Sequence, residues 1–123
     1  MSIRFKRRNV HKGASYTINP AVDACGTVFT NRDAGGAITF TLPTPNRALL
    51  GDWYRFKALV AQALVVAAPQ VDTLVVLDDA AAKSLSVPTI GGEMEAQCLE
   101  TASGVFQWAV SGITVGHVFT VTA

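Results

Sequence analysis

The sequence predicts an all-β domain, built either as an antiparallel β-sandwich or as a small jelly-roll-like barrel. One observation is that short runs of the 123-residue chain alternate apolar with polar residues, as half-buried strands do. The other is that Gly, Pro, Asn and Asp separate these runs at near-regular intervals, as tight turns do. No sustained helical periodicity or long repeat competes with this interpretation. The length is that of one ordinary domain.

Three runs alternate most cleanly, so one face of each is expected to point into the core. The residues expected to point inward are Ile38, Phe40 and Leu42 in 37–42, Tyr54, Phe56 and Ala58 in 53–59, and Met94, Ala96 and Cys98 in 93–100. Further strands are expected over 26–30, 71–77, 105–110 and 113–122. The last three strands of the chain are expected to form a meander.

Two segments have less decisive patterns. Residues 61–68 suit either a buried strand or a short helix, and a strand is favoured because Pro69 bounds the run and Val65 and Val66 are β-branched. Residues 78–83 are expected to form one helical turn with aspartates at its start. In the final strand, one face is expected to carry Ile113, Val115, His117, Phe119 and Val121.

The composition lies on the apolar side of the range for soluble proteins, with 50% hydrophobic and 15% charged residues. A membrane span is not expected, because the most apolar stretch, 58–68, contains Gln62 and is much shorter than the roughly 20 residues needed. A signal peptide is not expected either. The apolar excess therefore predicts a subunit interface. Cys25 and Cys98 are expected to be reduced and buried.

Positive charge is concentrated at the start of the chain. Five of the ten basic residues, Arg4, Lys6, Arg7, Arg8 and Lys12, lie in the first twelve positions without an acidic residue among them, while the rest of the chain carries a net charge of −4. Like charges without apolar periodicity disfavour independent folding. We therefore expect a basic arm over 1–13, ordered only on a partner, and a folded domain over 14–123.

Catalytic and metal-binding patterns are absent from the sequence, so no enzyme activity, metal or cofactor is expected. The chain has two histidines and two cysteines at no metal-ligand spacing, and it lacks a Gly-x-Ser-x-Gly element. Asp78-Asp79 is interpreted as a solvated turn and His117 as a structural histidine. His11 is expected to lie in solvent or against a partner.

Several short stretches resemble a widespread group of small bacteriophage virion proteins, which occur as head decoration proteins and as domains of tail structures. The resemblance lies in Cys-Gly-Thr-Val-Phe-Thr-Asn at 25–31, Gly-Ala-Ile-Thr-Phe-Thr-Leu-Pro at 36–43, Gly51 with Trp-Tyr-Arg-Phe at 53–56, Asp-Thr-Leu at 72–74 and Gly-Val-Phe-Gln-Trp at 104–108. The chain departs from the pattern at Val71, where a glycine is commoner.

The resemblance implies a binding module without catalytic residues: a capsid decoration or cement protein, made in the host cytoplasm and located on the virion surface. Its implied partners are the major capsid protein and further copies of itself, as a homotrimer or, second, a dimer. The residues expected to bind the capsid are Arg4, Phe5, Lys6, Arg7, Arg8 and Lys12. Nucleic acid is a weaker partner for the arm, because the acidic body would repel a polyanion.

A different class of function stays open at this point. The chain is alternatively a carbohydrate-binding or receptor-binding domain of a phage tail fibre or spike. Trp53, Tyr54 and Trp108 would then provide stacking platforms for sugar rings, although aromatic residues at alternating positions are also what a core requires.

Overall fold

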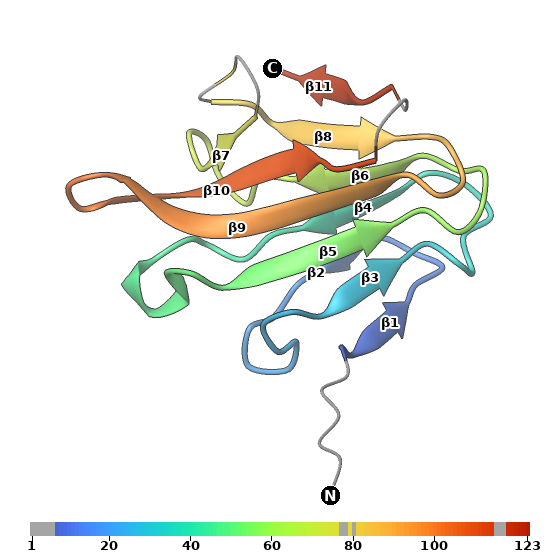
Figure 1. Cartoon of the computed structure of the whole chain (residues 1–123), viewed down its shortest axis with the longest axis horizontal. Helices are drawn as coiled ribbons and strands as arrows, with labels where there is room; N and C mark the ends of the chain where they lie inside the picture. Colours follow the sequence, from blue (N-terminus) through green and yellow to red (C-terminus); the bar gives the residue numbers. More distant parts are fainter. Residues whose placement is uncertain (1–6, 77–78, 80, 115–117) are drawn as a thin grey trace, which may run out of the picture.

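The computed structural model describes residues 7–76, 79, 81–114 and 118–123, and it consists of two packed β-sheets (Figure 1). The all-β sandwich is thus confirmed. The larger sheet has the order β1 (Asn9–His11), β3 (Val28–Thr30), β5 (Trp53–Lys57), β9 (Glu93–Ala102), β10 (Val105–Gly112) and β7 (Leu74–Val75). The smaller sheet has the order β11 (Thr120–Thr122), β8 (Ser84–Val87), β6 (Leu64–Ala67), β4 (Ile38–Thr41) and β2 (Tyr16–Thr17).

The chain alternates between the two sheets from β1 to β9, so several strands that are neighbours in a sheet are two places apart in the chain. Up to β6, strands two places apart in the chain are neighbours in one sheet and run in the same direction, whereas β6 and β8 are antiparallel. The pairs β1–β3–β5 and β2–β4–β6 are accordingly parallel. The prediction of an antiparallel sandwich is therefore wrong for these strands, and both sheets are mixed.

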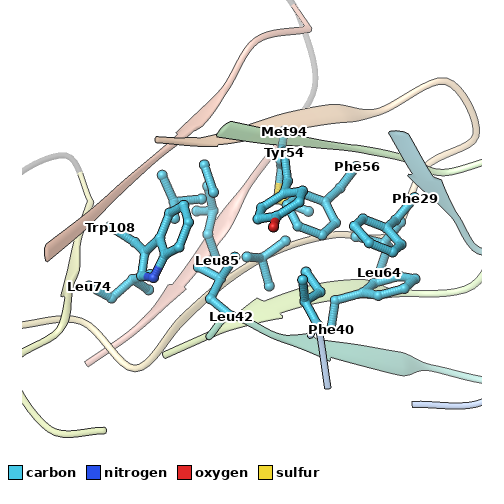
Figure 2. Close-up of a cluster of buried hydrophobic side chains, with 14 of the residues drawn as sticks. Phe29, Phe40, Leu42, Tyr54, Phe56, Leu64, Leu74, Leu85, Met94 and Trp108 are labelled. Carbon is cyan, nitrogen blue, oxygen red and sulfur yellow. The ribbon is translucent and has the colours of Figure 1, made fainter. Parts of the chain in front are cut away.

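The core lies between the sheets and contains an aromatic cluster (Figure 2). The ring of Phe29 lies 5.3 Å from that of Phe40 and 5.7 Å from that of Phe56, measured between centroids. The ring centroids of Tyr54 and Trp108 are 5.9 Å apart. Aromatic pairs at such separations add stabilisation beyond the area they bury.

The inward faces predicted from alternation are confirmed. All nine residues expected to point inward are buried: Ile38, Phe40, Leu42, Tyr54, Phe56, Ala58, Met94, Ala96 and Cys98. The ambiguous segment 61–68 contains strand β6, as favoured. A 3-10 turn, η1 (Arg47–Leu49), follows Asn46, whose side chain accepts hydrogen bonds from two backbone N–H groups of the turn.

The expected meander at the end of the chain is wrong. Strands β9 and β10 form a hairpin, but β11 crosses to the smaller sheet and pairs with β8. Strand β8 was not predicted, although Ser-Leu-Ser-Val alternates and buries Leu85 and Val87. Val115 and His117 lie outside the described residues.

The expected helical turn over 78–83 is also wrong for the residues described there. The backbone of Asp79 exchanges hydrogen bonds with Val76 in an antiparallel bridge, and the backbone N–H of Ala82 donates to the carbonyl of Leu74, so Asp79 and Ala82 lie beside the strand end of β7. Asp78 and Ala80 lie outside the described residues. Leu74 and Val76 are buried, which places this bridge at the margin of the core.

The described part of the expected basic arm belongs to the sandwich. Strand β1 pairs with β3, and backbone hydrogen bonds from Val28 to Arg8 and from Lys12 to Thr30 extend the pairing at both ends. Val10 packs against the core. The boundary predicted at residue 14 is therefore wrong for Asn9–His11, because pairing with β3 stabilises a segment that carries one apolar residue.

Both cysteines are free, but only Cys98 is buried, so the expectation of two buried thiols is wrong for Cys25. Burial raises the pKa of the Cys98 thiol. Within the described residues, no helix has the length and apolar character needed to cross a bilayer.

Candidate interaction surface

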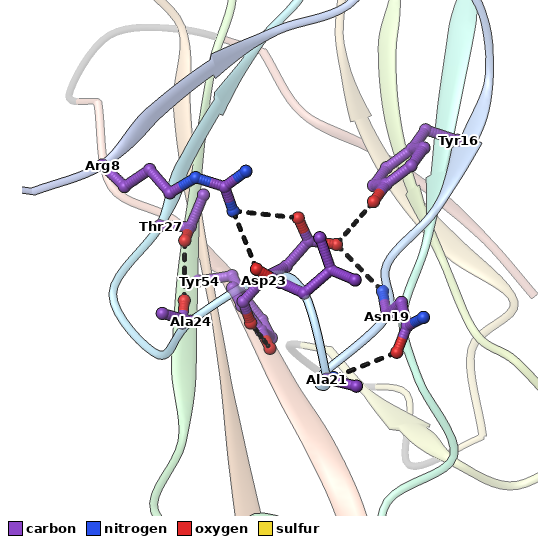
Figure 3. Close-up of polar contacts among 9 residues, drawn as sticks. Arg8, Tyr16, Asn19, Ala21, Asp23, Ala24, Thr27 and Tyr54 are labelled. Carbon is purple, nitrogen blue, oxygen red and sulfur yellow. Dashed lines mark hydrogen bonds and ion pairs between the residues drawn. The ribbon is translucent and has the colours of Figure 1, made fainter.

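The first described residues are fixed to the body by an ion pair at the start of β1. Arg8 Nη1 donates to Asp23 Oδ1 at 3.2 Å and to the carbonyl of Val22 at 3.1 Å (Figure 3). Asp23 is only 2% exposed, whereas the Arg8 side chain remains half exposed. A buried carboxylate needs such a partner, since an unpaired charge in the interior is strongly unfavourable.

The other oxygen of Asp23 is also satisfied. Its Oδ2 accepts hydrogen bonds from the Tyr16 hydroxyl at 2.7 Å and from the Asn19 backbone N–H at 2.9 Å. The Tyr54 hydroxyl donates to the Asp23 backbone carbonyl at 2.9 Å (Figure 3). Asp23 therefore joins the start of β1, strand β2 and the core strand β5 in one network.

The network changes the acidity of both tyrosines. The hydrogen bond to Asp23, followed by burial, raises the pKa of Tyr16. Burial, with smaller contributions from nearby carboxylates, raises the pKa of Tyr54 to about 12. Both hydroxyls therefore stay protonated as donors at neutral pH.

Arg7 lies on the outer face of the larger sheet. Its guanidinium carbon is 4.7 Å from the centre of the Trp53 ring, and that of Arg55 is 5.9 Å from the same ring. Gly26, at φ +85°, lies beneath the indole, where a Cβ would come within 3.3 Å of it. The absence of a side chain at Gly26 thus permits the Trp53 indole to lie close to the backbone, and the indole in turn contacts the guanidinium group of Arg7.

Lys12 lies beyond the other end of β1. Its ammonium nitrogen is 3.8 Å from the centre of the Tyr16 ring, in cation–π geometry. An aromatic ring holds a cation in place but does not neutralise it. In the described part of the chain, neither Arg7 nor Lys12 lies within ion-pair distance of a carboxylate. Both therefore present positioned, uncompensated positive charge.

The structure divides the six residues predicted to bind a capsid. Arg4, Phe5 and Lys6 lie outside the described residues. Arg7 and Lys12 flank β1 as held but uncompensated cations, whereas Arg8 is neutralised by Asp23.

His11, expected in solvent or on a partner, contacts the Thr30 hydroxyl through Nδ1 at 2.6 Å. The expectation that His11 lies in solvent or against a partner is therefore wrong. The parallel pairing of β1 and β3 places His11 beside Thr30.

Asp23, Tyr16 and Trp53 hold the three cations, and sequence patterns did not identify them in this role. Asp23 lies in a loop with no strand periodicity, and Tyr16 belongs to a strand of two residues. Trp53 was expected to provide a stacking platform for sugar rings, whereas its ring lies against Arg7.

Two of the three aromatic residues considered for sugar stacking belong to the core. Tyr54 and Trp108 are buried, and Trp108 Nε1 donates to the Pro43 carbonyl at 2.7 Å. Their expected role as platforms is therefore wrong, because the inward faces of β5 and β10 carry them. Trp53 is half-buried, and the guanidinium groups of Arg7 and Arg55 lie 4.7 and 5.9 Å from the centre of its ring.

Among the described residues, no group of three or more His, Cys, Asp or Glu side chains is placed to hold a metal ion. The surface around β1 presents the held cations Arg7 and Lys12. No protein-family model and no curated protein matches this chain.

Proposed function

We propose that this protein is a structural component of a bacteriophage virion, a decoration or cement protein that binds the outer surface of the capsid. The proposal joins the resemblance of the sequence to the surface around β1. It assigns no catalytic role to the chain, and its partner is an acidic region of the major capsid protein.

The observation that carries the proposal is the position of Arg7. Arg8 is paired with Asp23 and Arg7 is held over Trp53, so the first two described residues have fixed places on the sandwich. Arg4 and Lys6 lie just before these two residues in sequence. Holding a cation before binding reduces the conformational entropy lost on docking.

Several weak contacts are expected to act together in this attachment. An exposed ion pair contributes only about 0–1 kcal/mol, so Arg4, Lys6 and Arg7 need the support of apolar contacts from Phe5 and of several copies binding at once. Attachment should therefore weaken as salt rises, since the screening length falls from about 10 Å at 0.1 M to about 3 Å at 1 M.

The test is binding of the purified protein to purified capsids, measured by co-sedimentation at low and high salt. Removal of residues 1–6 and the variant Arg7→Glu are each expected to reduce capsid occupancy strongly. Lys83→Glu makes the same change of charge on the far side of the sandwich and is expected to bind as the original chain does. Equal binding by all four proteins would contradict the proposal.

The alternative function, a carbohydrate-binding or receptor-binding domain of a tail fibre or spike, now depends on Trp53. A glycan array separates the two functions. Binding of a glycan that is lost in Trp53→Ala, together with no binding to capsids, would favour the tail protein.

A further inference from the structure

Charge is divided between the two halves of the chain. Residues 1–57 contain nine basic and three acidic residues, a net charge of +6, whereas residues 58–123 contain one basic and six acidic residues, a net charge of −5. Removing Arg4 and Lys6, which lie outside the described residues, still leaves +4 in the first half.

The winding of the chain keeps these halves apart in space. In the larger sheet, β1, β3 and β5 form one side and β9, β10 and β7 the other. In the smaller sheet, β2 and β4 likewise lie on the side opposite to β8 and β11. Figure 1 shows this as blue-to-green strands on one side and yellow-to-red strands on the other. The sandwich is thus basic on one side and acidic on the opposite side.

Ion pairs compensate charge along the seam between the halves. Arg55 on β5 lies 3.2 Å from Glu93 and 3.7 Å from Glu95, both on β9. Arg47 of η1 lies 3.8 Å from Glu100. The seam is therefore close to neutral, and the charge that is left uncompensated lies toward the two outer sides.

On the basic side, three cations gather where parallel strands end. His11, Thr30 and Lys57 are in register across β1, β3 and β5. The last residues of neighbouring strands therefore lie about 5 Å apart across the sheet. Lys12, Arg32 and Lys57 lie at or just beyond these ends. We call these three residues the basic rim; Asp33, paired with Arg32, is the acidic residue beside it.

On the acidic side, two aspartates flank β7. Asp72 is exposed in the loop before the strand, and Asp79 is bridged to Val76 just after it. In the described part of the chain, neither lies within ion-pair distance of a cation. We call Asp72 and Asp79 the acidic edge.

We propose that the acidic edge of one copy docks on the basic rim of a second copy. The basic rim and the acidic edge are opposite in sign and lie on opposite sides of the same sandwich, so a second copy is the partner that the charges fit. Like sides placed together would repel. This inference rests on the proposed function in one respect: Arg7, which lies at the opposite end of β1 from Lys12, and residues 1–6 are assigned to binding the capsid and take no part in this contact.

The contact is head-to-tail, because it joins two different surfaces of the same chain. Two copies joined by such a contact still have one unoccupied basic rim and one unoccupied acidic edge. Further copies therefore add until a ring closes, or they continue to add as a filament. The expected assembly therefore contains three or more copies. A stable dimer requires the same surface on both partners and would contradict the proposal.

The experiment measures assembly mass against protein concentration by sedimentation velocity in low and high salt. Asp72→Asn with Asp79→Asn neutralises the acidic edge, and asparagine tolerates the positive φ of Asp72. Arg32→Glu with Lys57→Glu reverses part of the basic rim. Each double variant is expected to raise the dissociation constant at least about tenfold, because like or missing charges at a contact weaken it.

Asp33→Asn is the matched control, since it makes the same chemical change beside the basic rim. It removes a negative charge from the basic side and is expected to keep or tighten assembly. Circular dichroism of every variant checks that the fold is retained. A monomer at all concentrations, or equal weakening by Asp33→Asn and the acidic-edge variant, would overturn the proposal.

The same proteins separate this inference from the proposed function. Assembly that depends on the acidic edge, in a protein that never binds capsids, would leave the head-to-tail contact standing and remove the capsid role. Capsid binding with assembly that ignores the acidic edge would do the reverse.

Discussion

Arg8 Nη1 donates to Asp23 Oδ1 at 3.2 Å, and this pair connects the first described strand to a carboxylate that is 2% exposed. Three donors converge on the two oxygens of Asp23. An asparagine in its place has one acceptor oxygen and no charge. It loses either the bond from Arg8 at the Oδ1 position or the bonds from Tyr16 and Asn19 at the Oδ2 position, and its NH₂ group then faces those donors.

Asp23→Asn is therefore expected to lower the free energy of unfolding by about 1–3 kcal/mol. Asp33→Asn, which alters an exposed pair with Arg32, is expected to change it by less than about 0.5 kcal/mol. Urea unfolding of both variants measures the difference. Equal stability of the two would show that the Asp23 network contributes nothing measurable to the fold.

Two truncations test whether strand β1 belongs to the sandwich. Removal of residues 1–6 is expected to leave the unfolding temperature nearly unchanged, whereas removal of residues 1–12 deletes β1 and leaves Asp23 buried without Arg8. The longer truncation is expected to lower the stability by several kcal/mol, as breaking a buried pair does. Equal unfolding temperatures would contradict the assignment of β1 to the fold.

Alternation predicted the strands that turn one face to the core, because buried positions must recur every second residue in a half-covered sheet. Phe40, Tyr54 and Met94 were placed correctly on this basis. Strands β1 and β2 were missed because each lies at a sheet edge and needs few apolar residues.

Strand direction and the partners of the cations were not predictable in the same way. Parallel pairing joins strands that a strand of the other sheet separates in the chain, and the alternation within one strand does not record which strand becomes its neighbour. The contact of Lys12 with Tyr16 joins residues close in sequence, but that of Arg7 with Trp53 depends on the packing of β1 beside β3 and β5. The basic cluster was visible in the sequence; its attachment to the body was not.

The two tryptophans are expected to respond differently to replacement by phenylalanine. Trp108 is fully buried and its indole N–H is bonded to the Pro43 carbonyl, so Trp108→Phe leaves that acceptor unpaired and a gap beside Tyr54. A loss of about 2–4 kcal/mol is expected. Trp53→Phe, on the outer face, is expected to lose less than about 1 kcal/mol. Thermal unfolding followed by far-UV circular dichroism compares them, and equal losses would contradict the core assignment of Trp108.

The fold is expected to weaken in alkali because of Tyr54. Its pKa is raised from 10.0 to about 12, so the unfolded chain releases this proton first as pH rises. The stability linked to Tyr54 is complete below pH 10 and is lost as pH rises through about 12. Tyrosinate absorbance and unfolding measured together should show Tyr54 ionising with the loss of structure. In Tyr54→Phe this late step should disappear; if it persists, the hydroxyl bonded to Asp23 is not its source.

The most direct test of the proposed function is quantitative mass spectrometry of purified phage particles after surface labelling of intact virions with a lysine-reactive reagent. The proposal predicts that this protein is present in many copies per particle, that its exposed lysines are labelled without opening the capsid, and that Arg7→Glu reduces its copy number. A protein abundant in infected cells but absent from purified particles would contradict the proposal.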